Sequence, residues 1–198
     1  MNRRQRHGVF LLPFLLASAA CQTLPDQQEM TATACAELPC REAGPVVVLD
    51  AAGTAHFLAV PQGPRWAGGI LSLVPGESAH LRWTEGPDGG ERLAWETDPE
   101  RADLSFRLEP LRPSRTGEHE GKLMRLRIHN RSPRDLYLEA EHQPAGDNRL
   151  LPLFATAVPA ESRVQRSWPH LILEMQLSGW RALPGEEPHG TEPNPGES

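Results

Sequence analysis

The stretch that decides the fold runs from Lys122 to His142 and reads KLMRLRIH, NRSPR and DLYLEAEH in three successive parts. In the first and third parts apolar and polar side chains alternate, which is the pattern of a β-strand with one buried face. Folded as a hairpin around residues 130–134, the two runs bring apolar residues opposite each other: Ile128 with Leu136, Leu126 with Leu138, and Met124 with Ala140. On the other face this register places Arg127 beside Tyr137 and Arg125 beside Glu139. A shift of this register by one residue would point the charged side chains toward the core.

The same alternation extends along most of the chain. Val46–Leu49 and Thr54–Val60 flank Asp50–Gly53, which predicts a second hairpin. A third hairpin joins Ser78–Glu85 to Glu91–Thr97, with Trp83 opposite Leu93, Leu81 opposite Trp95, and Glu85 opposite Glu91. Further alternating runs are Ile70–Val74, Leu104–Leu108 and Leu171–Leu177. With 20 Pro and 17 Gly to form turns, the chain is predicted to be all-β, an antiparallel β-sandwich of about nine or ten short strands without a helix.

Two segments of the chain resemble a known class of domain, and this resemblance makes the fold prediction more specific. The run from Arg125 to His142, followed by Leu150–Phe154, resembles immunoglobulin-like domains of bacterial envelope proteins. The resemblance implies an immunoglobulin-like sandwich and assigns no functional residue. We expect one domain over residues 41–183, followed by a disordered tail over 184–198 that is rich in Pro, Gly and Glu.

The N-terminus indicates export. Residues 1–6 are basic, residues 9–16 are apolar, and small residues end at Ala20 before Cys21. This segment resembles a bacterial lipoprotein signal, although Ser18 stands where that family usually has Leu. The resemblance implies removal of residues 1–20, lipidation of Cys21, and anchoring to a membrane; Gln22, in place of Asp, implies the outer membrane facing the periplasm. An ordinary secretory cut, which would leave an unanchored periplasmic protein, is the alternative.

Residues 21–40 are predicted to form a flexible tether that ends in a small cysteine loop. With Cys21 assigned to lipid, Cys35 and Cys40 remain as a pair. Because an exported protein enters an oxidising compartment, we expect these two cysteines to form a disulfide. A metal half-site is the alternative, but no second cysteine pair or neighbouring His completes four ligands. We therefore expect neither a metal nor a cofactor.

Composition and motifs exclude several functions. The net charge is −6, whereas a nucleic-acid-binding surface needs a net basic stripe, so no nucleic-acid partner is expected. The spacings typical of serine hydrolases, nucleotide-binding loops, zinc proteases and EF-hands are absent. Three tryptophans fall outside clean alternation or on the polar side of a strand and could bind a glycan or a protein partner: Trp66, Trp168 and, on the polar side of the last strand, Trp180.

The function predicted from these features is a non-catalytic envelope lipoprotein that serves as a binding or structural accessory module. One alternative is a periplasmic hydrolase of glycan or peptidoglycan, with carboxylates drawn from Glu139, Glu141 and the loop Glu118–Glu120. His129 beside Asp135 could form half of a general-base unit, but a polar pair closing the hairpin is the simpler interpretation. The other alternative is a small-ligand or metal carrier that uses His and Met.

Overall fold

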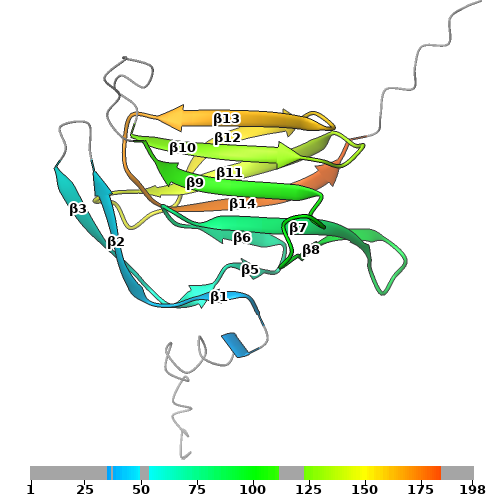
Figure 1. Ribbon diagram of the computed structural model, residues 1–198, viewed down its shortest axis with the longest axis horizontal. Coiled ribbons are helices and arrows are strands. Elements are labelled where there is room, and N and C mark those ends of the chain that lie inside the picture. The colour runs from blue at the N-terminus through cyan, green and yellow to red at the C-terminus, as the bar shows by residue number, and fades with distance from the viewer. Residues whose placement is uncertain (1–34, 37, 50–53, 112–122, 184–198) are drawn as a thin grey trace, which may run out of the picture.

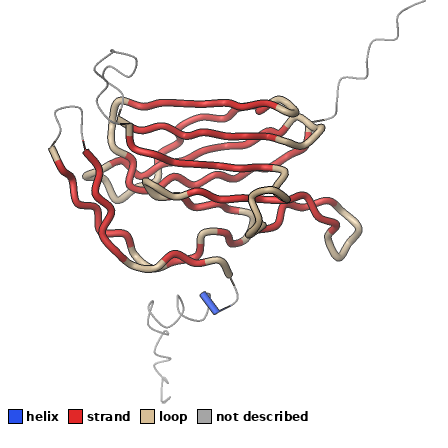
Figure 2. Tube along the Cα trace, viewed as in Figure 1, coloured by secondary structure: helices blue, strands red, loops and turns tan. Residues whose placement is uncertain are grey.

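A computed structural model describes residues 35–36, 38–49, 54–111 and 123–183 (Figure 1). These residues fold almost entirely into antiparallel strands, so the all-β prediction is confirmed for the described part of the chain. The strands form two five-stranded sheets and two smaller two-stranded sheets. Figure 2 shows the two large sheets as stacked layers of strands, with a two-stranded ribbon standing beside them.

The first large sheet, called the β9 sheet here, has the strand order β13-β10-β9-β7-β8. Its strands are β7 (Ser78–Glu85), β8 (Glu91–Trp95), β9 (Leu104–Pro110), β10 (Met124–Asn130) and β13 (Ser162–Trp168). The second, called the β14 sheet, has the order β12-β11-β14-β6-β5. Its strands are β5 (Trp66–Ala67), β6 (Ile70–Leu73), β11 (Leu136–Pro144), β12 (Leu151–Val158) and β14 (Ile172–Ala182).

The hydrophobic core lies between these two sheets. Both supply fully buried side chains to one cluster, including Phe106, Leu108 and Leu126 from the β9 sheet and Leu71, Leu138 and Leu177 from the β14 sheet. Burial of each such side chain contributes about 1.5–3 kcal/mol relative to exposure. The alternation in the sequence therefore identified the inward faces of most of these strands; in β14 it failed for Ile172, which is fully buried, and for Trp180, which packs against the core.

Two of the three predicted hairpins are confirmed. In the β7–β8 hairpin Trp83 lies opposite Leu93, Leu81 opposite Trp95, and Glu85 opposite Glu91, which is the expected register. The second is the pair of β2 (Gly44–Leu49) and β3 (Ala55–Val60). The expected turn residues 50–53 of that hairpin lie outside the described residues.

The hairpin predicted between residues 122 and 142 is wrong. Strand β10 pairs with β9 and β13, whereas β11 pairs with β12 and β14 in the opposite sheet. Leu126 faces Leu108 and Arg166 rather than Leu138. The reason is that alternation shows only which face of a strand is buried. Two strands with buried apolar faces can be neighbours in one sheet or can pack across the core from opposite sheets, and their alternation is the same in both cases.

Residues 130–134, which were expected to form the turn, instead connect β10 in one sheet to β11 in the other. The side chain of Asn130 stabilises this connection. Its buried Nδ2 donates to the carbonyl oxygens of Arg134 at 2.7 Å, Pro159 at 3.0 Å and Val158 at 3.2 Å. Its Oδ1 accepts hydrogen bonds from the backbone and the hydroxyl of Ser132. One side chain at the end of β10 thus binds polar groups on the β10–β11 connection, at the end of β12 and directly after it.

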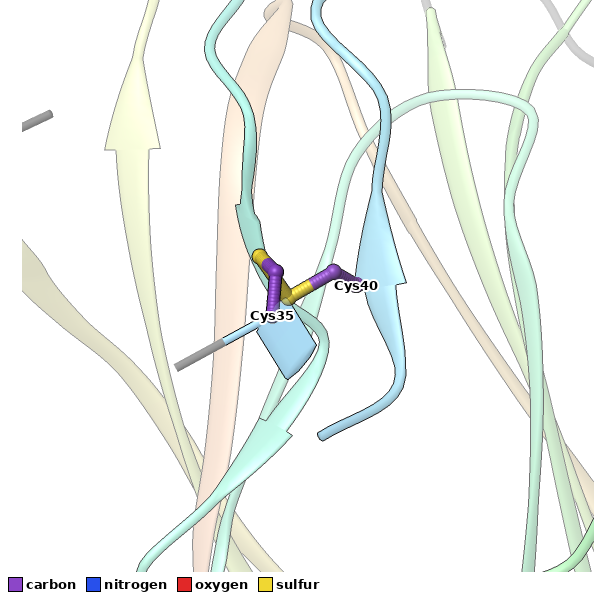
Figure 3. Close-up of a disulfide and its surroundings, with 2 residues drawn as sticks. All are labelled: Cys35 and Cys40. Atoms are coloured by element: carbon purple, nitrogen blue, oxygen red, sulfur yellow. A yellow bond between two sulfur atoms is a disulfide. The ribbon is translucent and has the colours of Figure 1, made fainter. Parts of the chain in front are cut away.

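The N-terminal part of the described chain is fastened to the β14 sheet. A disulfide joins Cys35 to Cys40, as the sequence predicted (Figure 3). Directly after it, β1 (Cys40–Arg41) pairs with β4 (Gly63–Pro64). The guanidinium of Arg41 donates to Ser72 in β6 and forms an ion pair with Glu77 at 3.2 Å. The predicted signal, the tether up to residue 34 and the tail from residue 184 lie outside the described residues.

Candidate functional site

The most unusual surface is the outer face of the β2–β3 ribbon. In an antiparallel pair, alternate cross-strand pairs share one face. The three pairs on this face are all apolar: Pro45 with Ala59, Val47 with Phe57, and Leu49 with Ala55. All six side chains are exposed, and Phe57 retains 75% of its accessible surface. We refer to these six residues as the apolar ribbon face.

The opposite face of the same ribbon is mostly apolar and carries one polar side chain, that of His56. Val48 is buried, and Val46 and Leu58 pack against the main core. The inner face of the ribbon therefore packs against the domain. The outer face contributes no such packing, so the folding of the domain does not explain why it is apolar as well. An apolar patch that stays in water is typical of a surface that binds a partner. Among the described strands, β2 and β3 pair only with each other, so each also leaves one backbone edge unpaired within that part of the chain.

A second candidate is a groove of about 550 Å³ lined by four of the five tryptophans: Trp66, Trp83, Trp95 and Trp180. It lies where the terminal strands of the two large sheets, β8 and β5, come together, with Glu91 and Arg92 at its rim. The indole N–H of Trp83 is buried there without a hydrogen-bond partner among the described residues. Aromatic faces beside a few polar groups could accept a flat or ring-shaped ligand.

The contacts of Trp180 show how much of this groove is structural. Its ring packs edge-on against Phe106 at 5.5 Å and lies 6.1 Å from Trp66, while its Nε1 donates to the carbonyl oxygen of Gly69 at 2.6 Å. The sequence placed Trp180 on the polar side of its strand, and that is wrong. The register of β14 against β11 shifts beside Gly179, which has a φ of 66°. This bulge adds one residue to the strand and turns Trp180 inward.

Trp168, the remaining candidate from the sequence, packs between the sheets at their other side. Its ring stacks on Phe154 of β12 with centroids 5.9 Å apart. It is half-buried against the core, as is Trp66. The structure therefore brings Trp66 and Trp180 together in the groove and places Trp168 away from them.

The polar residues suggested for catalysis do not assemble as the sequence analysis expected. Asp135 accepts a hydrogen bond from the backbone of Ala160 and does not pair with His129, whose Nδ1 lies 3.4 Å from Nε of Arg131. The expected contact of Arg125 with Glu139 is also absent, because these residues lie in different sheets and Arg125 binds Glu109 at 2.5 Å.

The carboxylates named for a hydrolase have no shared site in the described structure. Glu139 and Glu141 are exposed on β11, and Glu139 accepts a hydrogen bond from Tyr137 at 3.1 Å. Residues 118–120 lie outside the described residues.

The outer face of the β9 sheet is strongly basic for a chain with a net charge of −6. Glu109 is surrounded there by three guanidinium groups, those of Arg107, Arg125 and Arg127. Burial, followed by the charges of Arg163 and Arg131, lowers the pKa of His129 below its usual value. The neutral imidazole is favoured by this field, and the face could attract an anion.

Comparison with protein-family models, with curated proteins and with solved structures finds no match for this chain. Within the described part of the chain, no helix has the length and apolar character needed to cross a membrane. The choice among candidate sites therefore rests on their physical chemistry. The apolar ribbon face is the one whose composition the stability of the domain does not explain.

Proposed function

We propose that this protein is a non-catalytic lipoprotein of the bacterial envelope that binds a protein partner through the apolar ribbon face. The observation that carries the proposal is the set of three exposed apolar cross-strand pairs on β2 and β3. Keeping such a surface in water costs about 25 cal/mol for each Å² that a partner would cover. A binding role accounts for that cost.

The chemistry of this face favours a protein over a glycan as the partner. None of its six side chains carries a hydrogen-bonding group, so it offers nothing to recognise sugar hydroxyls. It does offer apolar area next to the unpaired strand edges of the ribbon. An extended segment of a partner could add a strand to such an edge while its apolar side chains cover the face.

The proposed address suits this role. A diacylated Cys21 would anchor the chain stably, whereas a single acyl chain gives only marginal binding. The ribbon begins at Gly44, close after the Cys35–Cys40 disulfide at the end of the proposed tether. The apolar ribbon face would then be presented near the outer membrane, on its periplasmic side.

The finer description of the fold belongs to the same proposal. We infer an immunoglobulin-like sandwich, which is supported by two antiparallel sheets around one core and by chain crossings between the sheets after β6, β10, β12 and β13. Domains of this kind commonly serve as binding modules on which short strands and loops carry the contacts.

The binding surface can be tested by placing a photo-crosslinking amino acid at Phe57 in the full-length protein expressed in cells. We expect a specific adduct with another protein, and we expect Val47→Ser in the same chain to reduce it. The matched control is the same crosslinker at Leu150, an exposed leucine elsewhere on the domain. Equal labelling from both positions, or an adduct formed only with a second copy of this chain, would contradict the proposed partner.

The address is tested separately. Wild-type protein should fractionate with membranes, and Cys21→Ala should release it or block its maturation. Recovery of the wild-type protein from the periplasmic fluid with Ala20 as its first residue would refute the lipoprotein proposal and leave the binding surface to be judged on its own.

A further inference from the structure

Two histidines meet at one end of the core, far from each other in sequence. His142 lies near the end of β11 and is buried, and His170 lies on the connection between β13 and β14 and is half-buried. Their Nε2 atoms face each other at 3.1 Å, and their ring centroids are 5.0 Å apart. Neither ring has a part in the proposed binding surface.

The hydrogen-bond pattern determines which nitrogen is available. Nδ1 of His142 lies 3.2 Å from the carbonyl oxygen of Leu151. Because a carbonyl oxygen can only accept, Nδ1 carries the hydrogen and the Nε2 of the neutral ring presents a lone pair. Metal-binding histidines are commonly oriented in this way, with the second ring nitrogen donating to a backbone carbonyl. In the metal-free protein the Nε2–H of His170 therefore donates to Nε2 of His142. A metal would displace this hydrogen, and with the ring hydrogen on Nδ1 His170 presents its own Nε2 lone pair.

The distance between the two nitrogens fits two ligands of one ion. With metal–nitrogen bonds of about 2.0–2.1 Å, nitrogens 3.1 Å apart are held at an angle of about 95–100°. This angle lies near the values of octahedral and tetrahedral sites and excludes a linear two-coordinate ion. At least one further ligand is therefore required.

The described residues contain no group of three or more His, Cys, Asp or Glu side chains that could hold a metal. Met175 supplies a different kind of ligand. It lies directly opposite His142 in the β11–β14 register, points to the same side of the sheet, and is fully buried. Cross-strand neighbours have Cβ atoms about 4.5–5.5 Å apart, within reach of a long thioether side chain. Imidazole together with thioether is a soft ligand set that selects Cu(I) among common metals.

We propose that His142, His170 and Met175 form a Cu(I) site at this end of the core, based on the 3.1 Å approach of the two Nε2 atoms and on the register that places Met175 directly opposite His142. The site departs from the main expectation from sequence, that no metal is bound, and is of the kind named in the alternative of a metal carrier that uses His and Met. The sequence did not identify these residues, because His142 and His170 come together only when β11 and the β13–β14 connection are packed.

The test is an anaerobic titration of the full mature chain with Cu(I) in competition with a chromophoric Cu(I) chelator. We expect one Cu(I) per chain, and at least about tenfold weaker binding for His170→Gln, whose half-buried position makes misfolding a small risk. His142→Gln should weaken binding similarly, and His129→Gln is the matched control that should bind as the wild type does.

The thioether is tested by Met175→Leu, which conserves side-chain volume in the core. We expect weaker Cu(I) binding and loss of the sulfur scatterer from the X-ray absorption spectrum, with the melting temperature nearly unchanged. Failure of the wild type to hold one Cu(I), or binding by His170→Gln or Met175→Leu as tight as that of the wild type, would overturn the site.

Discussion

Replacing Asn130 by Asp tests the crossover between the two sheets with a change of almost no volume. The substitution removes the Nδ2 donor that now serves the carbonyl oxygens of Arg134, Val158 and Pro159. The amide has two hydrogens, which the three carbonyl oxygens share, so the lost hydrogen bonds amount to about 2 kcal/mol at about 1 kcal/mol each. A buried carboxylate facing carbonyl oxygens adds a penalty of about 2 kcal/mol. We therefore expect a loss of about 4 kcal/mol at neutral pH, a large share of the 5–15 kcal/mol that is typical of a domain.

Thermal unfolding followed by circular dichroism measures this loss, which corresponds to a decrease in Tm of roughly 8–16 °C for a domain of this size. Burial raises the pKa of the introduced carboxyl group above its value in the unfolded chain, so protonation favours the folded variant. The difference in stability between variant and wild type should consequently narrow as the pH falls. Asn148→Asp, in an exposed loop, is the control. A variant at position 130 that melts within about 2 °C of the wild type at neutral pH would refute the role of Asn130.

Three further predictions concern the core, the bulge and the disulfide. Leu126→Asp should abolish the cooperative transition, because the side chain is fully buried and an unpaired charge there costs several kcal/mol, while Thr54→Ser should melt as the wild type does. Gly179→Ala should lose about 1–2 kcal/mol in denaturant unfolding, because φ is 66° and a Cβ would approach a neighbouring side chain to 3.1 Å; an unchanged midpoint would contradict this. Unreduced protein should show no alkylation at Cys35 or Cys40 by mass spectrometry, and two labelled thiols would show the bridge to be absent.

The sequence predicted strands and their buried faces far better than it predicted strand partners. Leu126 and Leu138 were both expected to point inward, and both are fully buried. They lie in opposite sheets, however, and not side by side. Alternation reports only whether a side chain meets water, so it cannot distinguish a hydrogen-bonded neighbour from a strand across the core.

The local sequence was sufficient to predict strand pairing where a short turn directly connects the two strands. The β7–β8 hairpin was predicted in the correct register because Gly86–Gly90 is short and rich in turn residues, which limits how the flanking strands can meet. The segment after β10 also contains turn-forming residues, Ser132 and Pro133. There, buried hydrogen bonds from Asn130 to residues almost thirty positions away decide the path, and no short window of sequence contains that information.

The apolar ribbon face was missed for a related reason, whereas Trp66 and Trp180 of the groove were named from the sequence. Phe57 and Val47 were recognised as strand residues, but a fully apolar run such as Val46–Leu49 predicts burial on both faces, as in the interior of a sheet. The structure instead leaves the pair exposed on a two-stranded ribbon. An apolar run therefore has a second explanation besides the core of its own domain, which is the one we propose for this ribbon: a partner covers its outer face. Both explanations give the same pattern of apolar residues, and only the packing of the strands distinguishes them.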